Sequence, residues 1–298
     1  MKNQIKQCRQ DKVFTAFNYL LLFVLMVAFL YPLIYVISCS FSSGDALMTG
    51  KVKLFPVEPS LQGYKMVFAY DPIWTGYRNS LLYMVVGTLI SVVLTIMAAY
   101  PLSRKDLRGY KGIMTYFVFT MMFSGGMIPS YLLVNQLNID NTMWAIVLPT
   151  AVSAYNVIVV RTYYSQSIPR ELLEASKIDG CSDYKFLWHI VLPLSKPIIA
   201  VIGLWVAVAL WNSYFNALIY LNSEEKYPLQ LVLRGILITN QANLSSSISD
   251  PEVLENMNLV SEMFKYGTII ISSLPLMVLY PFVQKYFVKG VMLGSVKG

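Results

Sequence analysis

Long stretches without a charged side chain dominate the pattern of hydrophobic and polar positions along the chain. Six stretches contain no Asp, Glu, Lys or Arg, namely residues 13–44, 79–103, 112–139, 141–160, 197–223 and 266–284. Each holds 19 or more residues, and a helix rising about 1.5 Å per residue needs roughly 20 to cross a hydrocarbon core. The pattern therefore predicts an all-α, polytopic integral membrane protein with six transmembrane helices.

We expect all six spans to belong to one transmembrane domain, residues 1–298. The expected spans are at about residues 14–40, 79–103, 112–134, 142–164, 194–221 and 267–287. The external segment at 41–78 contains Pro56, Pro59 and Pro72, which predict an irregular excursion with little helix.

Two further features are expected on the outer side. The glycines at 125–126 and Pro129 predict a bend in the outer half of the third span. In the second external segment, residues 222–266, Asp250 and Pro251 are typical of a helix start. That helix would carry an apolar stripe formed by Val253, Met257, Val260 and Phe264. We expect it to lie on the outer face and to lead into the last span.

Composition supports a membrane location over a soluble enzyme. The chain is 56% hydrophobic and 13% charged, whereas soluble domains average about 25% charged residues. The net charge is +7, but no basic run interleaved with aromatic residues suggests nucleic-acid binding. With the N-terminus inside, 16 of the 23 Lys and Arg residues fall on the inner side. The positive-inside rule therefore places both termini in the cytoplasm.

The three cysteines, Cys8, Cys39 and Cys181, provide neither a disulfide framework nor a metal cluster. Residues 36–39 resemble a lipoprotein cleavage box, and the basic N-terminus before an apolar run resembles a signal peptide. That run is about twice as long as a signal-peptide core, and five further spans follow. We therefore interpret the first span as an uncleaved anchor.

The cytoplasmic segment at 165–193 predicts two short helices separated by a turn. Pro169 can open the first helix, Gly180 can close it in a left-handed conformation, and Ser182 or Asp183 can open the second. The second helix carries an apolar stripe of Phe186, Leu187, Ile190 and Val191. Such a pair of helices, presented from a membrane bundle, is typical of a docking surface for another protein.

The spacing within this segment resembles the EAA loop of ATP-binding-cassette importer permeases. The matching residues are Glu174, Ala175, Ser176, Gly180, Ile190, Leu192 and Pro193. Ser176 replaces the usual second alanine. In that family the loop forms the coupling helix that sits in a cleft of the ATPase. The resemblance therefore implies an ATPase-coupling set of Glu171, Glu174, Ala175, Ser176, Asp179, Gly180, Ile190, Leu192 and Pro193.

Other stretches are similar to carbohydrate importer permeases of the MalG-like type, and within it to the Lpl/Ytc-like group. These are residues 124–133, 156–161, 211–216, 227–230 and 294–298. The resemblance implies a MalG-like fold and ATP-driven import of an oligosaccharide or other carbohydrate across the bacterial plasma membrane by alternating access. It implies as partners a MalF-like permease, a homodimeric cytosolic ATPase and an external sugar-binding (lipo)protein. It also implies an ATPase contact by the C-terminal residues Val296, Lys297 and Gly298.

No catalytic or metal site is predicted, so we expect a transporter subunit and not an enzyme. Gly44, Gly50 and Lys51 superficially resemble a phosphate-binding loop, but the glycine spacing is wrong and Val52 replaces the required Ser or Thr. ATP and Mg should therefore be bound by the partner ATPase, and this chain should hold no cofactor. His189 lacks neighbouring ligands and is expected at the surface. Four acidic residues could be interpreted as paired carboxylates for acid–base catalysis. We interpret them instead as the solvated, partner-facing side of two short helices: Glu171, Glu174, Asp179 and Asp183.

A possible substrate path runs along the fifth span. Trp205, Asn212 and Asn216 recur there at helical spacing, while Tyr155 and Asn156 on the fourth span are weaker candidates. Aromatic rings can stack on sugars and carboxamides can bond to their hydroxyls, but asparagines also hold neighbouring spans together. Both interpretations stay open, as does direct contact of this subunit with the sugar.

The alternative function is an ion-coupled secondary sugar carrier, or a channel, acting without an ATPase. Such proteins use ionisable residues within their spans and often show inverted repeats. The six stretches contain no Asp, Glu, Lys or Arg, and no internal repeat is visible, so the importer is favoured. The identity, length and linkage of the sugar are not determined by this sequence.

Overall fold

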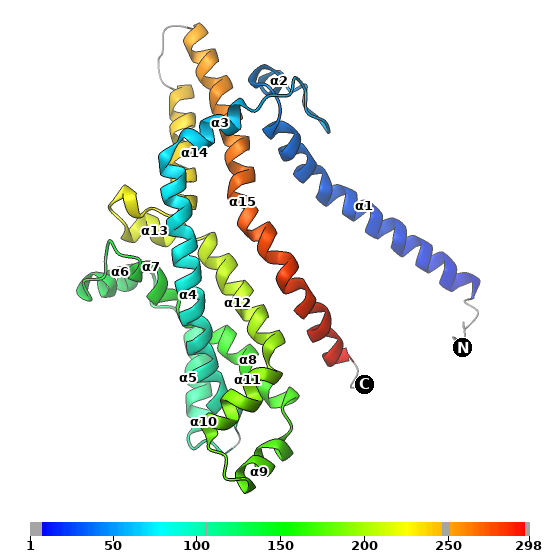
Figure 1. Ribbon diagram of the computed structural model, residues 1–298, viewed down its shortest axis with the longest axis vertical. Coiled ribbons are helices and arrows are strands. Elements are labelled where there is room, and N and C mark those ends of the chain that lie inside the picture. The colour runs from blue at the N-terminus through cyan, green and yellow to red at the C-terminus, as the bar shows by residue number, and fades with distance from the viewer. Residues whose placement is uncertain (1–7, 105, 246–250, 296–298) are drawn as a thin grey trace. The chain divides into compact units, whose positions relative to one another are not determined.

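The computed structural model describes residues 8–104, 106–245 and 251–295, and the elements in these ranges are helices and turns without strands (Figure 1). The helices of the first half are α1 (Arg9–Ser40), α2 (Gly44–Met48), α3 (Gln62–Ala69), α4 (Asp71–Ser103), α5 (Tyr110–Met122), α6 (Met127–Gln136) and α7 (Trp144–Val147). Those of the second half are α8 (Ala154–Ser167), α9 (Arg170–Ile178), α10 (Asp183–Phe186), α11 (Leu192–Leu194), α12 (Lys196–Trp211), α13 (Phe215–Tyr220), α14 (Leu229–Ser245) and α15 (Pro251–Ser295). Single turns of 3-10 helix occupy Leu148–Thr150 and Glu224–Lys226, and a π-turn occupies Leu187–Val191.

Several of these helices are long and apolar enough to cross a membrane. Within the described residues, three qualify alone: Gln10–Ser40 in α1, Asp71–Ser103 in α4 and Met257–Pro281 in α15. Three bent pairs qualify together, which gives up to six spans if each pair counts as one. The all-α, polytopic fold class predicted from the sequence is thus matched by the helices themselves. The orientation of the termini stays a prediction.

The chain separates into two compact units. One combines the stretches Met1–Tyr70 and Ile236–Ser273, and the other combines Asp71–Gly235 and Leu274–Gly298. The single domain predicted for residues 1–298 is not tested by this division and stays a prediction. Each unit is described by itself.

In the first unit, glycines allow α3 and α15 to approach closely. A Cβ atom added to Gly63 would lie 2.6 Å from the carbonyl oxygen of Met263, so only glycine permits this contact. Tyr70 packs edge-on against Phe264, with ring centroids 5.7 Å apart. Cys39 is buried and forms no disulfide.

One expectation for the outer segments needs correction, and another is confirmed. The stretch at 41–78 contains α2, α3 and the first turns of α4, not little helix. The hydroxyl of Ser43 caps α2 by accepting from the Ala46 N–H at 3.2 Å, and Pro72 lies in the first turn of α4, where its missing N–H costs nothing. The helix expected to begin at Pro251 does begin there and, as expected, leads into the last span, continuing without a break to Ser295.

The bend expected at 125–126 is a full break in the helix. α5 ends at Met122, α6 begins at Met127, and their axes differ by 110°. Gly126 adopts φ 87°, a conformation that side chains disfavour. Pro129 lies within the first turn of α6, where it does not interrupt the helix.

The second unit is built around α4, which packs against α8 and α12 (Figure 1). One face of α4 carries small residues four apart that are fully buried or nearly so: Gly87, Ser91, Thr95 and Ala99. Small side chains allow helix backbones to approach within a membrane. A Cβ atom at Gly87 would lie 2.6 Å from a Leu210 methyl carbon. The core at the far end of this face joins α4 and α12 to the helices of the 165–193 segment.

Candidate functional site

The predicted coupling segment, residues 165–193, folds as two short helices joined by a glycine turn. Pro169 occupies the N-cap position of α9, as its fixed φ and preceding chain direction allow. After α9 the chain passes through Gly180 at φ 72°. The Cys181 N–H then donates to the carbonyl oxygen of Ser176 at 2.9 Å, which is the hydrogen bond of a Schellman ending.

The second helix of the coupling segment is longer than its α-helical part. Ser182 caps α10 by accepting from the Lys185 N–H at 3.4 Å. The π-turn at Leu187–Val191 then continues the helix into α11. This helical stretch, Asp183–Leu194, meets α12 at an angle of 80°. The turn at Ser195 therefore directs the chain from the coupling segment into the bundle.

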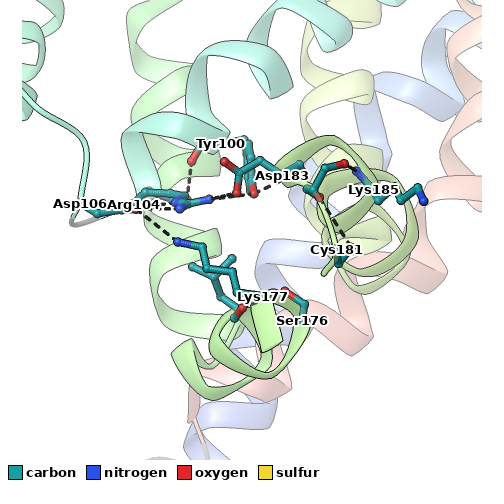
Figure 2. A network of polar contacts seen from close by, with 11 residues as sticks. Tyr100, Arg104, Asp106, Ser176, Lys177, Cys181, Asp183 and Lys185 are labelled. Atoms are coloured by element: carbon teal, nitrogen blue, oxygen red, sulfur yellow. Dashed lines mark hydrogen bonds and ion pairs between the residues drawn. The ribbon is translucent and has the colours of Figure 1, made fainter. Parts of the chain in front are cut away.

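The residues predicted to couple to an ATPase are mostly exposed. Exposed positions are Glu171, Glu174, Ala175, Asp179, Gly180 and Pro193, while Ile190 and Leu192 are half-buried. Ser176 is the exception, because it is buried and its hydroxyl donates to the Leu173 carbonyl at 2.8 Å. A buried position explains why a small side chain is required there, and Ser176 satisfies that requirement as alanine would. Figure 2 shows this part of the segment.

The apolar surface of the coupling segment differs from the stripe expected from the sequence. Phe186 and Val191 are buried in the core of the second unit and do not face outward. Three other apolar side chains are exposed instead, with exposed fractions of 87% for Ile178, 80% for Tyr184 and 66% for Trp188. These three residues were not predicted from the sequence, although Tyr184 and Trp188 are four apart and so share a helix face.

The candidate substrate path is only partly assembled as predicted. Tyr155 on α8 and Trp205 on α12 stack, with centroids 6.0 Å apart and an interplanar angle of 29°. Both rings are partly exposed, so each retains a face for contact. Asn156, the neighbour of Tyr155, is buried, because adjacent helix positions point in different directions.

The prediction that Asn212 and Asn216 share one helical face with Trp205 is wrong, because the helix does not continue beyond Trp211. α12 ends there, and Asn212 is its C-cap, with a side-chain amide that donates to the Val208 carbonyl at 2.9 Å. Asn216 lies on α13, after a break in the helix. Asparagine and serine side chains form hydrogen bonds with nearby backbone groups and thereby compete with continuation of the helix. Residue spacing alone does not reveal this competition.

The remaining predicted positions do not gather into a catalytic or metal-binding site in the part of the chain that the structure describes. His189 is exposed and its Nδ1 lies 3.1 Å from the Lys185 carbonyl oxygen. Across the described ranges, no three His, Cys, Asp or Glu residues gather as potential metal ligands. Cys8, Cys39 and Cys181 carry free thiols. The predicted C-terminal ATPase contact, Val296, Lys297 and Gly298, lies outside the described residues.

Comparison with known proteins identifies the family. Residues 72–293 match the family described as "Binding-protein-dependent transport system inner membrane component". The chain belongs to this family. These inner membrane components are subunits of importers, and the predicted recognition of an ATP-binding-cassette importer permease is therefore confirmed.

Individual relatives of this inner membrane component match along nearly their whole lengths. It is 40% identical to the polygalacturonan/rhamnogalacturonan transport system permease protein YtcP of Bacillus subtilis (strain 168), over 95% of this chain and 96% of that protein. It is 38% identical to protein LplC of the same organism, over 97% of both. A crystal structure of a bacterial ABC transporter involved in the import of the acidic polysaccharide alginate matches with a TM-score of 0.85 and 34% identity. That match covers 95% of this chain and 100% of the other.

These findings decide between the two functions considered from the sequence. They support an ATP-driven importer permease with a MalG-like fold, and they do not support an ion-coupled carrier. A multi-pass location in the plasma membrane follows from the family and from the apolar helices. As a transport permease subunit, the chain is consistent with the prediction that it is not itself an enzyme.

Proposed function

We propose that this subunit pairs with a MalF-like permease and a homodimeric cytosolic ATPase to import an acidic oligosaccharide delivered by an external binding (lipo)protein. ATP and Mg are bound by the ATPase in this proposal, and this chain holds no cofactor. The observation that carries it is the exposed helix–glycine–helix of α9 and α10. Its spacing resembles the EAA loop, and it projects from the bundle core with apolar side chains uncovered.

The exposed apolar residues of the coupling segment are better suited to contact with an ATPase cleft than to exposure to water. Ile178, Tyr184 and Trp188 are largely exposed, and large aromatic side chains are typical anchors of protein interfaces. Exposed Glu171 and Glu174 on α9 supply negative charge beside them. Such a mixed surface would dock in a cleft with apolar walls and a basic rim.

Acidity of the substrate is supported by the relatives. YtcP is named for polygalacturonan and rhamnogalacturonan, and the structural relative for alginate, described as an acidic polysaccharide. In this chain, the stacked rings of Tyr155 and Trp205 offer a platform for sugar rings. Arg234 on α14 places its Cζ atom 5.8 Å from the ring centroid of Tyr214, which lies in the break after α12, and adds a cation that could pair with a uronate carboxylate.

Transport by the reconstituted complex tests this function. The chain would be coexpressed with its partner permease and ATPase, placed in proteoliposomes and supplied with the binding protein. We expect uptake of oligogalacturonides or alginate oligomers that requires ATP, with neutral oligosaccharides of equal length transported more slowly. Uptake by this chain alone under an ion gradient would contradict the proposal. Preference for neutral sugars would contradict only the acidic substrate class.

A further inference from the structure

Arg104 lies directly after α4 and is held between two carboxylates (Figure 2). Its Nε and Nη2 donate to the two oxygens of Asp106 at 3.0 and 2.7 Å. Its Nη1 donates to Asp183, the first residue of α10. The Arg104 side chain is only 12% exposed, whereas the Asp106 and Asp183 side chains are 55% and 59% exposed, so the guanidinium is held in place while its carboxylate partners remain in contact with water.

The same loop also contacts the other helix of the coupling segment. The Nζ of Lys177, on α9, lies 3.8 Å from an Asp106 carboxylate oxygen. Tyr100, in the last turns of α4, adds a hydroxyl that lies 3.5 Å from the Asp183 carbonyl oxygen and 3.4 Å from Arg104 Nη1. Arg104 therefore contacts α10 directly, whereas α9 is reached only through Asp106 in the loop that follows α4, as Figure 2 shows.

Pairing favours the charged forms of Arg104 and Asp106. The hydrogen bonds from Arg104 are the main cause that lowers the pKa of Asp106 from 3.8 to about 2. The same pairing raises the pKa of Arg104 above its ordinary value. Because folding lowers the pKa of Asp106, its pairing with Arg104 stabilises the folded state above pH 3.8, and this stabilisation is lost as the pH falls toward 2. The Arg104–Asp106 pair therefore stays charged near neutral pH and does not act as a pH switch.

The position of α4 in the chain gives this link its importance. α8 precedes the coupling segment and α12 follows it, so the backbone joins both helices to the segment. α4 ends some sixty residues earlier and can receive movement of the segment only through side-chain contacts. Leu102 and Phe186 share an apolar core at the same place, but apolar packing is non-directional, whereas a two-carboxylate arginine clamp fixes orientation.

We propose that Arg104 is a positioning residue that ties the end of α4 to α10 directly and to α9 through Asp106, so that displacement of the segment by the ATPase moves α4 with α8 and α12. This inference rests on the proposed importer function. Because α4 packs on α8 and α12, the three helices would shift together around the stacked Tyr155 and Trp205. Without the clamp, α4 would lag behind the other two.

The test measures communication between the two ends of the complex. In the complete reconstituted complex, loaded binding protein should stimulate ATP hydrolysis. For Arg104→Ala we expect this stimulation, and sugar uptake with it, to fall by at least about fivefold, the lower range of allosteric couplings. The amount of ATPase that co-purifies should not change. Arg104→Lys should not rescue the loss, because one ammonium cannot replace the guanidinium fork.

Two further variants make the result specific. Arg108→Ala is the matched control, since it removes an exposed arginine from the same loop for which the described structure gives no ion pair, and it should behave as wild type. Asp183→Asn keeps the side-chain size and removes one arm of the clamp, so it should also lower stimulation. Combined with Arg104→Ala, it should add little, because the two changes break one interaction.

The possible outcomes separate this inference from the proposed function. A wild-type complex without binding-protein-stimulated ATP hydrolysis would refute the importer function itself. A functional wild type in which Arg104→Ala, Arg104→Lys and Asp183→Asn all match Arg108→Ala would overturn the clamp. If Arg104→Ala failed to assemble, the size-conserving Asp183→Asn would decide, with normal stimulation counting against the clamp.

Discussion

Gly180 carries the residue-scale requirement that is simplest to test. Its φ of 72° suits glycine, and a Cβ atom added there would meet no atom within 4 Å. Gly180→Val therefore causes backbone strain of about 1–3 kcal/mol without a steric clash. We expect normal expression but loss of binding-protein-stimulated ATP hydrolysis and of uptake, because the angle between α9 and α10 would change.

A matched control for Gly180 exists in the other unit. Gly50 has φ 65° and also no atom within 4 Å of an added Cβ, so Gly50→Val applies a similar strain away from the coupling segment. Its transport rate should stay near that of the wild type. Wild-type transport by Gly180→Val would show that α9 and α10 do not act as one rigid element.

The Tyr155–Trp205 pair allows the two interpretations of the substrate path to be separated. If the exposed ring faces bind sugar, Trp205→Ala should raise the KM for uptake by up to about tenfold, as expected for aromatic contacts of about 0.5–1.5 kcal/mol. ATPase assembly should be unaffected. Trp205→Phe, which keeps a stacking ring, should recover most of the affinity. An unchanged KM with lowered thermal stability in Trp205→Ala would instead indicate a packing role.

At the scale of elements, the exposed apolar face of the coupling segment makes a prediction about assembly. Changing Ile178, Tyr184 and Trp188 together to serine removes side chains that are not part of the permease core, so folding should be preserved. Each buried aromatic anchor typically contributes about 2 kcal/mol or more to an interface. We therefore expect co-purification of the ATPase to be lost, as measured by pull-down at matched permease amounts.

A control for this triple substitution is Phe55→Ser. Phe55 is also highly exposed but lies between α2 and α3, outside the coupling segment. It should leave ATPase binding unchanged. Retained ATPase binding in the triple variant would place the docking surface elsewhere on the chain.

Local signals explain which elements could be predicted from the sequence. The caps at Ser182 and Gly180 act within a few residues, so the helix–glycine–helix was predictable from residue types alone. The sequence did not indicate which side of that helix pair is exposed, because α10 with its π-turn has apolar residues on two sides. Periodicity could not show that Phe186 faces the core while Trp188 faces outward, since that depends on packing with α4.

Hydrophobicity was also insufficient to predict where spans break. α12 ends at Trp211, where the Asn212 amide bonds to the backbone, a single contact inside an uncharged stretch. The break before Gly126 was signalled by glycine, but its 110° angle was not. The Arg104 clamp joins residues about eighty positions apart, and nothing in a single sequence indicates such pairing.

At the scale of the whole molecule, the distribution of charge predicts an orientation that labelling can test. Sixteen of 23 basic residues fall on the side assigned to the cytoplasm, and insertion follows such a bias in short loops. In a variant with Cys8 and Cys39 changed to serine, the free and partly exposed Cys181 should react with thiol reagents only when they reach the cytoplasm. In a second variant that also lacks Cys181, a cysteine in place of exposed Asn222 should react with impermeant reagents added outside intact cells. The opposite labelling of these two sites would place the coupling segment outside, where no ATPase could reach it, and would refute the docking argument together with the orientation.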